Sequence, residues 1–467
     1  MPVAATISVH PTGAEDLAVE ALHDRCGIYT KPEVVKRILN SVGWTTRNDL
    51  SQASLLEPSA GDGAFLTEAA RRLVGSLRRR GIPLTVATLG PRIRGFELHP
   101  REAEKARERV RETLVDVRVR AATAEACARI WIANADFLLS NIRSDSFSHT
   151  AGNPPYVRWS KIPNELKSKY EQAVPPEMMG GDLFVPFLDR ALDALSAGGK
   201  CGLLCSDRWR FMAFGDGFRS KWLPRLDVHS EERVAADNAF VESVDSYPTI
   251  LHATKRAEAV QEPKRAKRRG NRITLTDAGC TIRVGPALGH TPAFVLERDE
   301  SDNELEPGLL AKWVAATEIS EGKITWTGRR IVIMNDAEGQ LIDLKSFPKL
   351  SARLERYRGK LSARSIVKNG SIWFRPIDRV RKIDWARPKI LVPELASTPR
   401  CAIDRGGIIP SHGVYAIFAP DDDVNWLYGQ LSDGQLSRAL RKLAPRVKGD
   451  YVRCYKRFLE MVRITPL

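Results

Sequence analysis

The chain has 467 residues, more than one ordinary domain needs, and 43% of them are hydrophobic, which is enough to build folded cores. No apolar run approaches the ~20 residues that cross a bilayer, and the seven cysteines are scattered without a Cys-x-x-Cys pair. A membrane protein, a disulfide framework and a structural zinc site are therefore not expected. We expect a cytoplasmic protein that binds no metal.

The net charge of +15 is divided unevenly along the chain. Residues 1–253 hold 33 Lys and Arg against 32 Asp and Glu, a net of +1, whereas residues 254–467 hold 39 against 25, a net of +14. A balanced half followed by a strongly basic half is typical of a catalytic domain joined to a module that binds a polyanion, most often nucleic acid. A solubilising charged surface is the alternative interpretation.

Short apolar strands alternate with helical stretches in the first half. Helices are expected at residues 64–80 and 100–115, and strands at residues 54–57, 92–97, 130–133, 147–152 and 201–205. Alternation at this spacing predicts an α/β domain with a Rossmann-like, doubly wound sheet over residues 1–253.

The second half has a different pattern. Residues 254–272 contain a run of basic residues, which we interpret as a linker or loop, with direct contact to phosphates as the alternative. Residues 273–467 hold short strands, turns and many aromatic side chains, and close with a basic helical stretch over residues 435–463. They are expected to form a separate α+β domain.

The tetrapeptide Asn153-Pro154-Pro155-Tyr156 directly follows the fourth expected strand and is the strongest chemical signal. Its prolines make the loop rigid and keep Asn153 at the end of the strand. Because prolines lack N–H groups, the loop presents carbonyl oxygens, and with the Asn153 side chain these suit a planar amino group. Tyr156 offers a face on which an aromatic base can stack. A proline turn with a buried tyrosine is the alternative.

Acidic side chains stand at the ends of the first three expected strands. Glu57 precedes a glycine turn, Glu97 ends the second strand, and Asp136-Phe137 follows the third. A carboxylate at such a position can hold ribose hydroxyls, and Asp136 can accept from an adenine amino group while Phe137 covers the ring. Each acidic residue alone fits a loop or cap, but polar residues at four consecutive strand ends predict a ligand site. The turn departs from the GxGxxG spacing of dinucleotide sites.

In this order the motifs resemble those of the gamma-class N6-adenine DNA methyltransferases of restriction–modification systems, over much of residues 27–253. The resemblance implies a class I methyltransferase fold with a mixed sheet, S-adenosyl-L-methionine as cofactor, and methylation of an adenine flipped out of double-stranded DNA. It implies the catalytic residues Asn153, Pro154, Pro155 and Tyr156. It implies the cofactor-binding residues Thr30, Glu57, Ser59, Gly61, Gly63, Glu97, Leu98, Asp136 and Phe137.

The resemblance extends to further residues. Phe240 is expected to stack on the flipped base opposite Tyr156, with Tyr247 as the alternative. Thr30 and Glu33 are expected to form a capping box at the first helix of the match. Residues 273–467 are similar to the family's DNA target-recognition domain.

Double-stranded DNA is thus the expected partner, and a cognate restriction endonuclease is a further candidate. No membrane is expected, and the chain is expected to be a monomer.

Three alternatives compete with this interpretation. Methyltransferases acting on amides or amino groups of protein or RNA share the Asn-Pro-Pro-Tyr motif but usually lack a basic second half. A DNA-binding module without catalysis would not need Asn153 and Glu97. A fused restriction enzyme would need more than the 26 residues before Gly27 for its nuclease domain.

Overall fold

The computed structural model describes residues 13–27, 29–234, 239–240, 248–258, 272–300, 305–444, 446–447 and 450–466. The chain divides into two compact units, unit 1 at Met1–Ala266 and unit 2 at Lys267–Leu467. None of the helices in the described ranges has both the length and the apolar character that a bilayer span requires.

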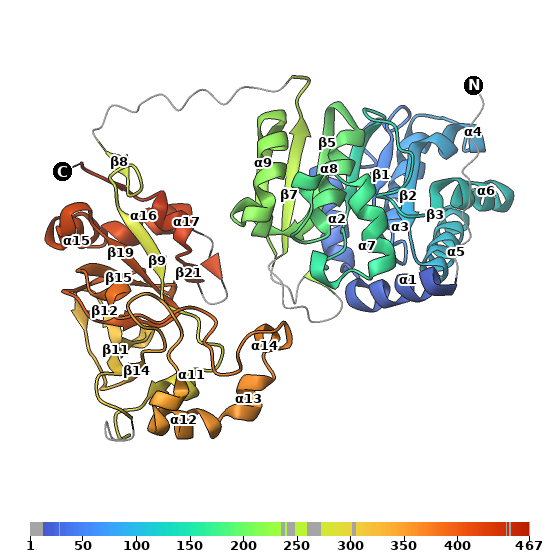
Figure 1. The fold of residues 1–467 in the computed structure, drawn as a ribbon. Helices are drawn as coiled ribbons and strands as arrows, with labels where there is room; N and C mark the ends of the chain where they lie inside the picture. The colour runs from blue at the N-terminus through green and yellow to red at the C-terminus, as the bar shows by residue number, and fades with distance from the viewer. Residues whose placement is uncertain are drawn as a thin grey trace. The chain divides into compact units, whose positions relative to one another are not determined.

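Unit 1 is built around a seven-stranded sheet with the strand order β3-β2-β1-β4-β5-β7-β6 (Figure 1). The strands are β1 Leu55–Glu57, β2 Ile93–Glu97, β3 Ile132–Asn134, β4 Phe147–Gly152, β5 Leu195–Ser206, β6 Leu226–Arg233 and β7 Pro248–Lys255. Strands β1 to β5 pair in parallel, and β7 pairs antiparallel with both β5 and β6. The expected Rossmann-like, mixed sheet of a class I methyltransferase is therefore confirmed.

Helices pack on both faces of this sheet (Figure 1). They are α1 Gly13–Cys26, α2 Pro32–Ser41, α3 Ala64–Arg79, α4 Val86–Leu89, α5 Pro100–Asp116, α6 Ala121–Trp131, α7 Asn164–Ala173, α8 Phe184–Ala194 and α9 Asp216–Trp222. Successive strand residues point to opposite faces, so Leu55 joins the core beneath α2, α3, α5 and α6, whereas Leu56 joins the core beneath α1, α7, α8 and α9. Both faces are thus buried, as a parallel sheet requires.

Two local expectations for unit 1 are wrong and a third is too short. Ile130 and Trp131 end α6 instead of beginning a strand, because the buried indole of Trp131 donates to the Leu89 carbonyl at 3.2 Å on the neighbouring helix. The strand expected over residues 201–205 is observed within β5, which starts earlier, at Leu195, because it already pairs with Phe147 there. The capping box at Thr30 does not form, because its backbone bridges Phe240 and α2 begins only after Lys31.

Unit 2 is an α+β unit with two four-stranded sheets, in the orders β10-β14-β11-β18 and β17-β15-β19-β9. Its strands are β8 Ile273–Thr274, β9 Thr281–Val284, β10 Val295–Leu296, β11 Leu310–Val314, β12 Ile319–Ser320, β13 Lys323–Ile324, β14 Arg330–Val332, β15 Lys389–Pro393, β16 Leu395–Ala396, β17 Ala402–Asp404, β18 Ile409–Pro410, β19 Val414–Phe418, β20 Arg446–Val447, β21 Tyr451–Arg453 and β22 Arg463–Ile464. Its helices are α11 Thr291–Phe294, α12 Pro348–Glu355, α13 Arg358–Ser362, α14 Ser365–Lys368, α15 Val424–Leu431, α16 Gln435–Leu443 and α17 Lys456–Glu460.

The sequence predicted one helical stretch over residues 435–463, and this prediction is wrong because strands interrupt the stretch. Helices α16 and α17 are real, but β20 and β21 lie between them because Val452 pairs with both Ala396 and Arg446 in a three-stranded sheet. The hydrophobic pattern of each short helix was visible in the sequence. The pairing that interrupts them depends on Ala396, 56 residues before Val452, and no local pattern reveals it.

Candidate active site

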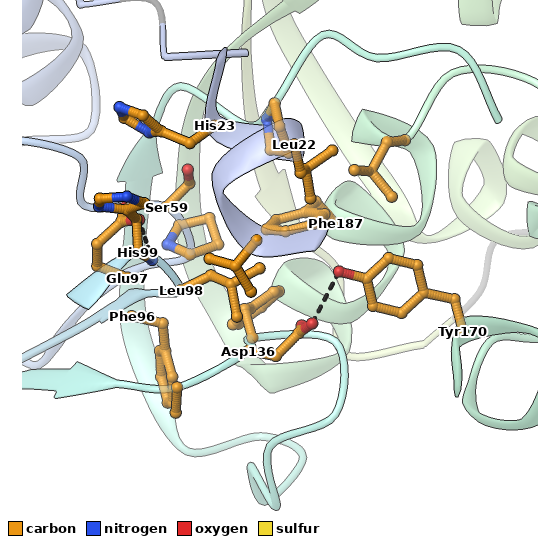
Figure 2. Close-up of a pocket in the computed structure, with 16 residues that line it drawn as sticks. Leu22, His23, Ser59, Phe96, Glu97, Leu98, His99, Asp136, Tyr170 and Phe187 are labelled. Carbon is orange, nitrogen blue, oxygen red and sulfur yellow. Dashed lines mark hydrogen bonds between the residues drawn. The ribbon is translucent and has the colours of Figure 1, made fainter. Parts of the chain in front are cut away.

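The carboxyl ends of the parallel strands bring the predicted polar residues to one edge of the sheet. Glu57 and Glu97 end β1 and β2, Asp136 follows β3, and Asn153 follows β4. A pocket opens at this edge (Figure 2), the place where doubly wound sheets bind their ligands. Six predicted residues line it, namely Ser59, Glu97, Leu98, Asp136, Phe137 and Pro155.

The turn between β1 and α3 needs its glycines. Gly61 has φ +52° and Gly63 has φ +84°, a region that L side chains rarely adopt. A Cβ on Gly63 would also lie 3.1 Å from the Ala106 Cα on α5. The chain therefore passes close to α5 here, and its backbone N–H groups face the end of β2.

Glu97 is fixed in place by these N–H groups. Gly61 donates to its Oε2 at 2.7 Å and His99 donates to its Oε1 at 2.8 Å. Burial raises the pKa of the Glu97 carboxyl, and the two N–H donors act in the opposite direction. Each oxygen keeps further acceptor capacity, so a positioned carboxylate faces the pocket and can accept from ligand hydroxyls.

Glu57 is the most deeply buried carboxyl of the site, with 1% of its surface exposed. Within the described residues nothing bonds its Oε2. Burial raises the pKa of Glu57 well above its usual range, and the neighbouring carboxylates of Asp62 and Glu97 add to this effect. A buried acceptor without a partner is costly, and it indicates a position at which a donor from a ligand belongs.

Asp136 is held by two donors. The Tyr170 hydroxyl on α7 donates to Oδ2 at 2.7 Å (Figure 2). The Leu138 N–H donates to Oδ1 at 2.8 Å. Burial raises the pKa of Asp136. Phe137 packs between Phe96 and Phe187, with ring centroids 5.5 and 5.4 Å away. A carboxylate beside an aromatic wall is an arrangement that suits an aminopurine ring.

Sequence reasoning missed the contribution of α1. Val19, Leu22 and His23 on this helix line the pocket (Figure 2). Glu20 pairs with His99 Nε2 at 2.7 Å, and the rings of His23 and His99 stack with centroids 4.4 Å apart. The spacing of Ala18, Val19 and Leu22, all buried, is the only signal that marked this stretch as a packed helix.

The Asn-Pro-Pro-Tyr loop begins directly after β4. The Asn153 side-chain oxygen is buried, and so is the Tyr156 hydroxyl, which nothing bonds within the described residues. The Tyr156 ring lies 6.0 Å from Phe184 and 5.9 Å from Phe240, centroid to centroid. Tyr156 thus belongs to an aromatic cluster with Phe184 and Phe240, three residues after Asn153.

Phe240 meets Tyr156 edge to face, with an interplanar angle of 78°. A base stacked between two parallel rings needs them about 7 Å apart, so Phe240 would have to turn or withdraw to admit one. Tyr247, the alternative, lies outside the described residues. Within the described ranges, no three His, Cys, Asp or Glu side chains are grouped so that they could hold a metal ion.

The fold and this edge of the sheet define a class I methyltransferase architecture. Residues 71–226 match the Eco57I restriction-modification methylase family. The Type II methyltransferase M.XhoI of Xanthomonas vasicola is 29% identical, over 94% of this chain and 91% of the relative. The Type II methyltransferase M.PaeR7I of Pseudomonas aeruginosa is also 29% identical, over 99% of this chain and 90% of the relative.

Among solved structures, the Type IIL restriction-modification enzyme MmeI in complex with DNA is similar in fold. The TM-score is 0.59 at 14% identity, over 97% of this chain and 67% of that chain. The expected resemblance to restriction–modification methyltransferases is therefore confirmed. The methylase matches also support S-adenosyl-L-methionine as the cofactor. The family match includes Glu97, Asp136 and the Asn-Pro-Pro-Tyr loop.

Proposed function

We propose that this protein is a site-specific DNA methyltransferase that acts on the N6 amino group of adenine in double-stranded DNA and protects DNA in a restriction–modification system. The single observation that carries the proposal is the position of Asn153 and Tyr156 directly after β4, at the edge that also holds the pocket. Monomeric action and a cognate endonuclease belong to the same proposal.

The pocket residues fit the cofactor. Glu97 offers two positioned oxygens to the ribose hydroxyls, while Asp136 accepts from the adenine amino group beside Phe137. Glu57 provides a buried acceptor without a described partner, and the glycine turn lets the backbone come close to the ligand. When bound, S-adenosyl-L-methionine supplies a methyl group on a sulfonium, which already leaves readily.

The chain's own residues must prepare the amino group that receives the methyl. The lone pair of an adenine amine is delocalised into the ring. Hydrogen bonds from that amine to the Asn153 side-chain oxygen and the Pro154 carbonyl favour a pyramidal nitrogen and aim its lone pair at the methyl group. This contribution is positioning plus electrostatic stabilisation in a buried site. Stacking on Tyr156 offsets part of the few kcal/mol needed to unstack the base.

The competing activity is methylation of an amide or amino group in protein or RNA. The basic second half favours a nucleic acid over a protein substrate, because unit 2 holds 35 Lys and Arg against 23 Asp and Glu, a net of +12. The similarity to restriction-modification methylases favours DNA over RNA. A positive surface of this size is expected to bind the phosphates of a duplex. A protein that only bound DNA, without methylating it, would have no role for the positioned carboxylates of Glu97 and Asp136.

Transfer of a labelled methyl group from S-adenosyl-L-methionine to duplex DNA tests the proposal. Asn153→Ala removes an acceptor used mainly in the transition state, so turnover should fall about 100-fold or more. Affinities for cofactor and duplex should stay within about twofold of wild type. Near-normal transfer by Asn153→Ala would contradict the mechanism, and label appearing in RNA or protein instead of DNA would contradict the substrate.

A further inference from the structure

The positive charge of unit 2 is concentrated in one segment. Residues 356–387 contain ten Lys and Arg against two Asp, a net of +8, out of the +12 carried by residues 267–467. The segment begins after α12 and includes α13 and α14, which follow one another at one end of unit 2 (Figure 1). A concentration of this kind requires a physical role, because like charges held close together repel.

One arginine of the segment has an internal role. The Arg364 guanidinium donates to four backbone carbonyls, those of Leu361 at 2.9 Å, Leu288 at 3.0 Å, Trp373 at 2.7 Å and Arg375 at 2.9 Å. It thereby fixes residues 371–379, which contain no helix or strand. We call these residues the 371–379 loop.

The 371–379 loop is anchored at both ends. Asp378 exchanges two hydrogen bonds with Ala287, at 2.9 and 2.8 Å, and the neighbouring Val380 N–H donates to the Asn335 side chain at 2.9 Å. Trp373 and Phe374 pack partly into the core of unit 2. The loop therefore has a defined backbone despite its irregular shape, as recognition loops on rigid scaffolds do.

The loop directs large side chains outward. Ile372 is 52% exposed and Ile377 is 44% exposed, although both lie in a loop whose backbone is held. Arg375 and Arg379 are exposed, and no ion pair involves either of them within the part of the chain that the structure describes. By contrast, Arg358 and Arg381 nearby pair with Glu355 and Asp384. Solvent-exposed isoleucines beside unpaired arginines form a surface that is suited to a partner rather than to water.

We propose that the 371–379 loop contacts the target duplex, with Arg375 and Arg379 binding phosphates or base edges and Ile372 and Ile377 contacting bases. The inference rests on the proposed function and assigns part of its sequence recognition. Charge identifies the occupant, because the loop belongs to a segment, residues 356–387, whose net charge of +8 fits a polyanion. Apolar groups between arginines suit thymine methyls and base faces more than a bare phosphate chain. Arg364 is then a positioning residue that holds the loop.

Equilibrium binding to two duplexes tests the inference, one carrying the methylated sequence found by modified-base sequencing and one with that sequence shuffled. The double variant Arg375→Ala/Arg379→Ala should lose about tenfold or more in affinity for the target duplex. Its plot of log affinity against log salt should be shallower by about 0.9 for each phosphate that the variant no longer binds. The variant Ile372→Ala/Ile377→Ala should keep the salt slope but lose preference for the target sequence.

The matched control is Arg298→Ala. Arg298 is exposed in the same unit but lies between Glu297 and Asp299, where a phosphate would be repelled. The affinity of the Arg298→Ala variant for both duplexes should therefore equal that of wild type. Loop variants that bind both duplexes as Arg298→Ala does would overturn the inference and leave the proposed function intact, provided that wild type methylates DNA. A wild-type protein that neither binds nor methylates duplex DNA would overturn both. Unchanged cofactor affinity in every variant shows that unit 1 is folded.

Discussion

At the scale of single residues, the site depends on carboxylates that the fold keeps away from water. Glu57 shows the cost most clearly, because burial raises its pKa well above the usual value of 4.5. The folded protein therefore retains a proton that the unfolded chain loses at lower pH. Stability should fall as pH rises through the folded-state pKa, and the penalty should vanish below about pH 4.5, where both states are protonated.

Glu57→Gln should therefore stabilise the ligand-free protein at neutral and higher pH, by on the order of 1 kcal/mol or more. The free energies of unfolding of variant and wild type should converge as the pH approaches about 4.5. Denaturant titrations at several pH values measure this difference. The exposed Glu104→Gln serves as control and should change stability little at any pH. The affinity of Glu57→Gln for the cofactor should fall even though its stability rises. A Glu57→Gln variant less stable than wild type at pH 8 would contradict the stability cost assigned to the buried carboxyl.

Tyr170→Phe tests how Asp136 is held. The substitution keeps the ring in its core but removes the donor to Asp136 Oδ2, so cofactor affinity should fall about 3- to 10-fold. An analogue with a carbonyl in place of the adenine amino group should bind both proteins equally, because Asp136 then has no amino group to accept from. Titration calorimetry measures the affinity for the cofactor and for the analogue, with Tyr428→Phe in unit 2 as control. Equal losses for the two ligands would show a general packing defect instead.

The sequence predicted Glu97, Asp136 and Asn153 because each follows an apolar strand, and parallel strands end at one edge. It could not predict Tyr170, which reaches Asp136 across 34 residues from a helix with no chemical motif. Glu20 and His99 were missed for the same reason, since their pairing joins α1 to the end of β2 over 79 residues. Local patterns identify groups at strand ends, but partners from other elements require the packed fold.

At the scale of elements, Arg364 determines whether the 371–379 loop is ordered. Arg364→Ala removes donors to four carbonyls, so unit 2 should lose about 2–3 kcal/mol of stability and its Tm should fall by about 4–12 °C. Amide hydrogen exchange within the loop should accelerate. The control is Arg358→Ala, since Arg358 is exposed and makes two weak surface contacts, an ion pair with Glu355 at 2.6 Å and a contact with the Trp373 ring at 4.7 Å. Each is worth about 1 kcal/mol or less. Equal melting temperatures in the two variants would contradict the structural role of Arg364.

Elements with strong local patterns were predicted closely, and those set by distant pairing were not. The expected helix over residues 64–80 is observed at Ala64–Arg79, because its amphipathic pattern and glycine turn are local. The start of β3, the missing cap at Thr30 and the strands inside residues 435–463 all depend on partners far away in sequence. Tertiary pairing overrode local preference at each of these positions.

At the scale of the whole molecule, chemistry and charge lie in different units. Residues 1–266 hold 37 Lys and Arg against 34 Asp and Glu, a net of +3, while the remaining residues carry +12. Strand β7 ends at Lys255, whose Nζ bonds Asp145 at 2.8 Å and the Leu195 carbonyl at 2.5 Å. A fragment comprising unit 1 must therefore extend beyond residue 253, and residues 1–258 retain these contacts.

The fragment 1–258 should bind S-adenosyl-L-methionine but not duplex DNA, because unit 1 has little excess positive charge. The affinity of the full chain for duplex should fall steeply with salt, by about 0.9 in the log–log slope for each phosphate bound. Fluorescence anisotropy over a range of salt concentrations measures duplex binding by the fragment and by the full chain, after gel filtration has shown that the fragment is not aggregated. A fragment that methylates the same target as the full chain would show that unit 2 is not the recognition unit.

Sequencing with detection of modified bases, on DNA from cells that express the protein, tests whether Asn153 carries sequence-specific adenine methylation. Cells with wild-type protein should hold N6-methyladenine at every copy of one short sequence, and cells with Asn153→Ala at equal abundance should hold none above background. Modified cytosine in place of adenine, or the same adenine methylation with Asn153→Ala, would contradict the proposed function.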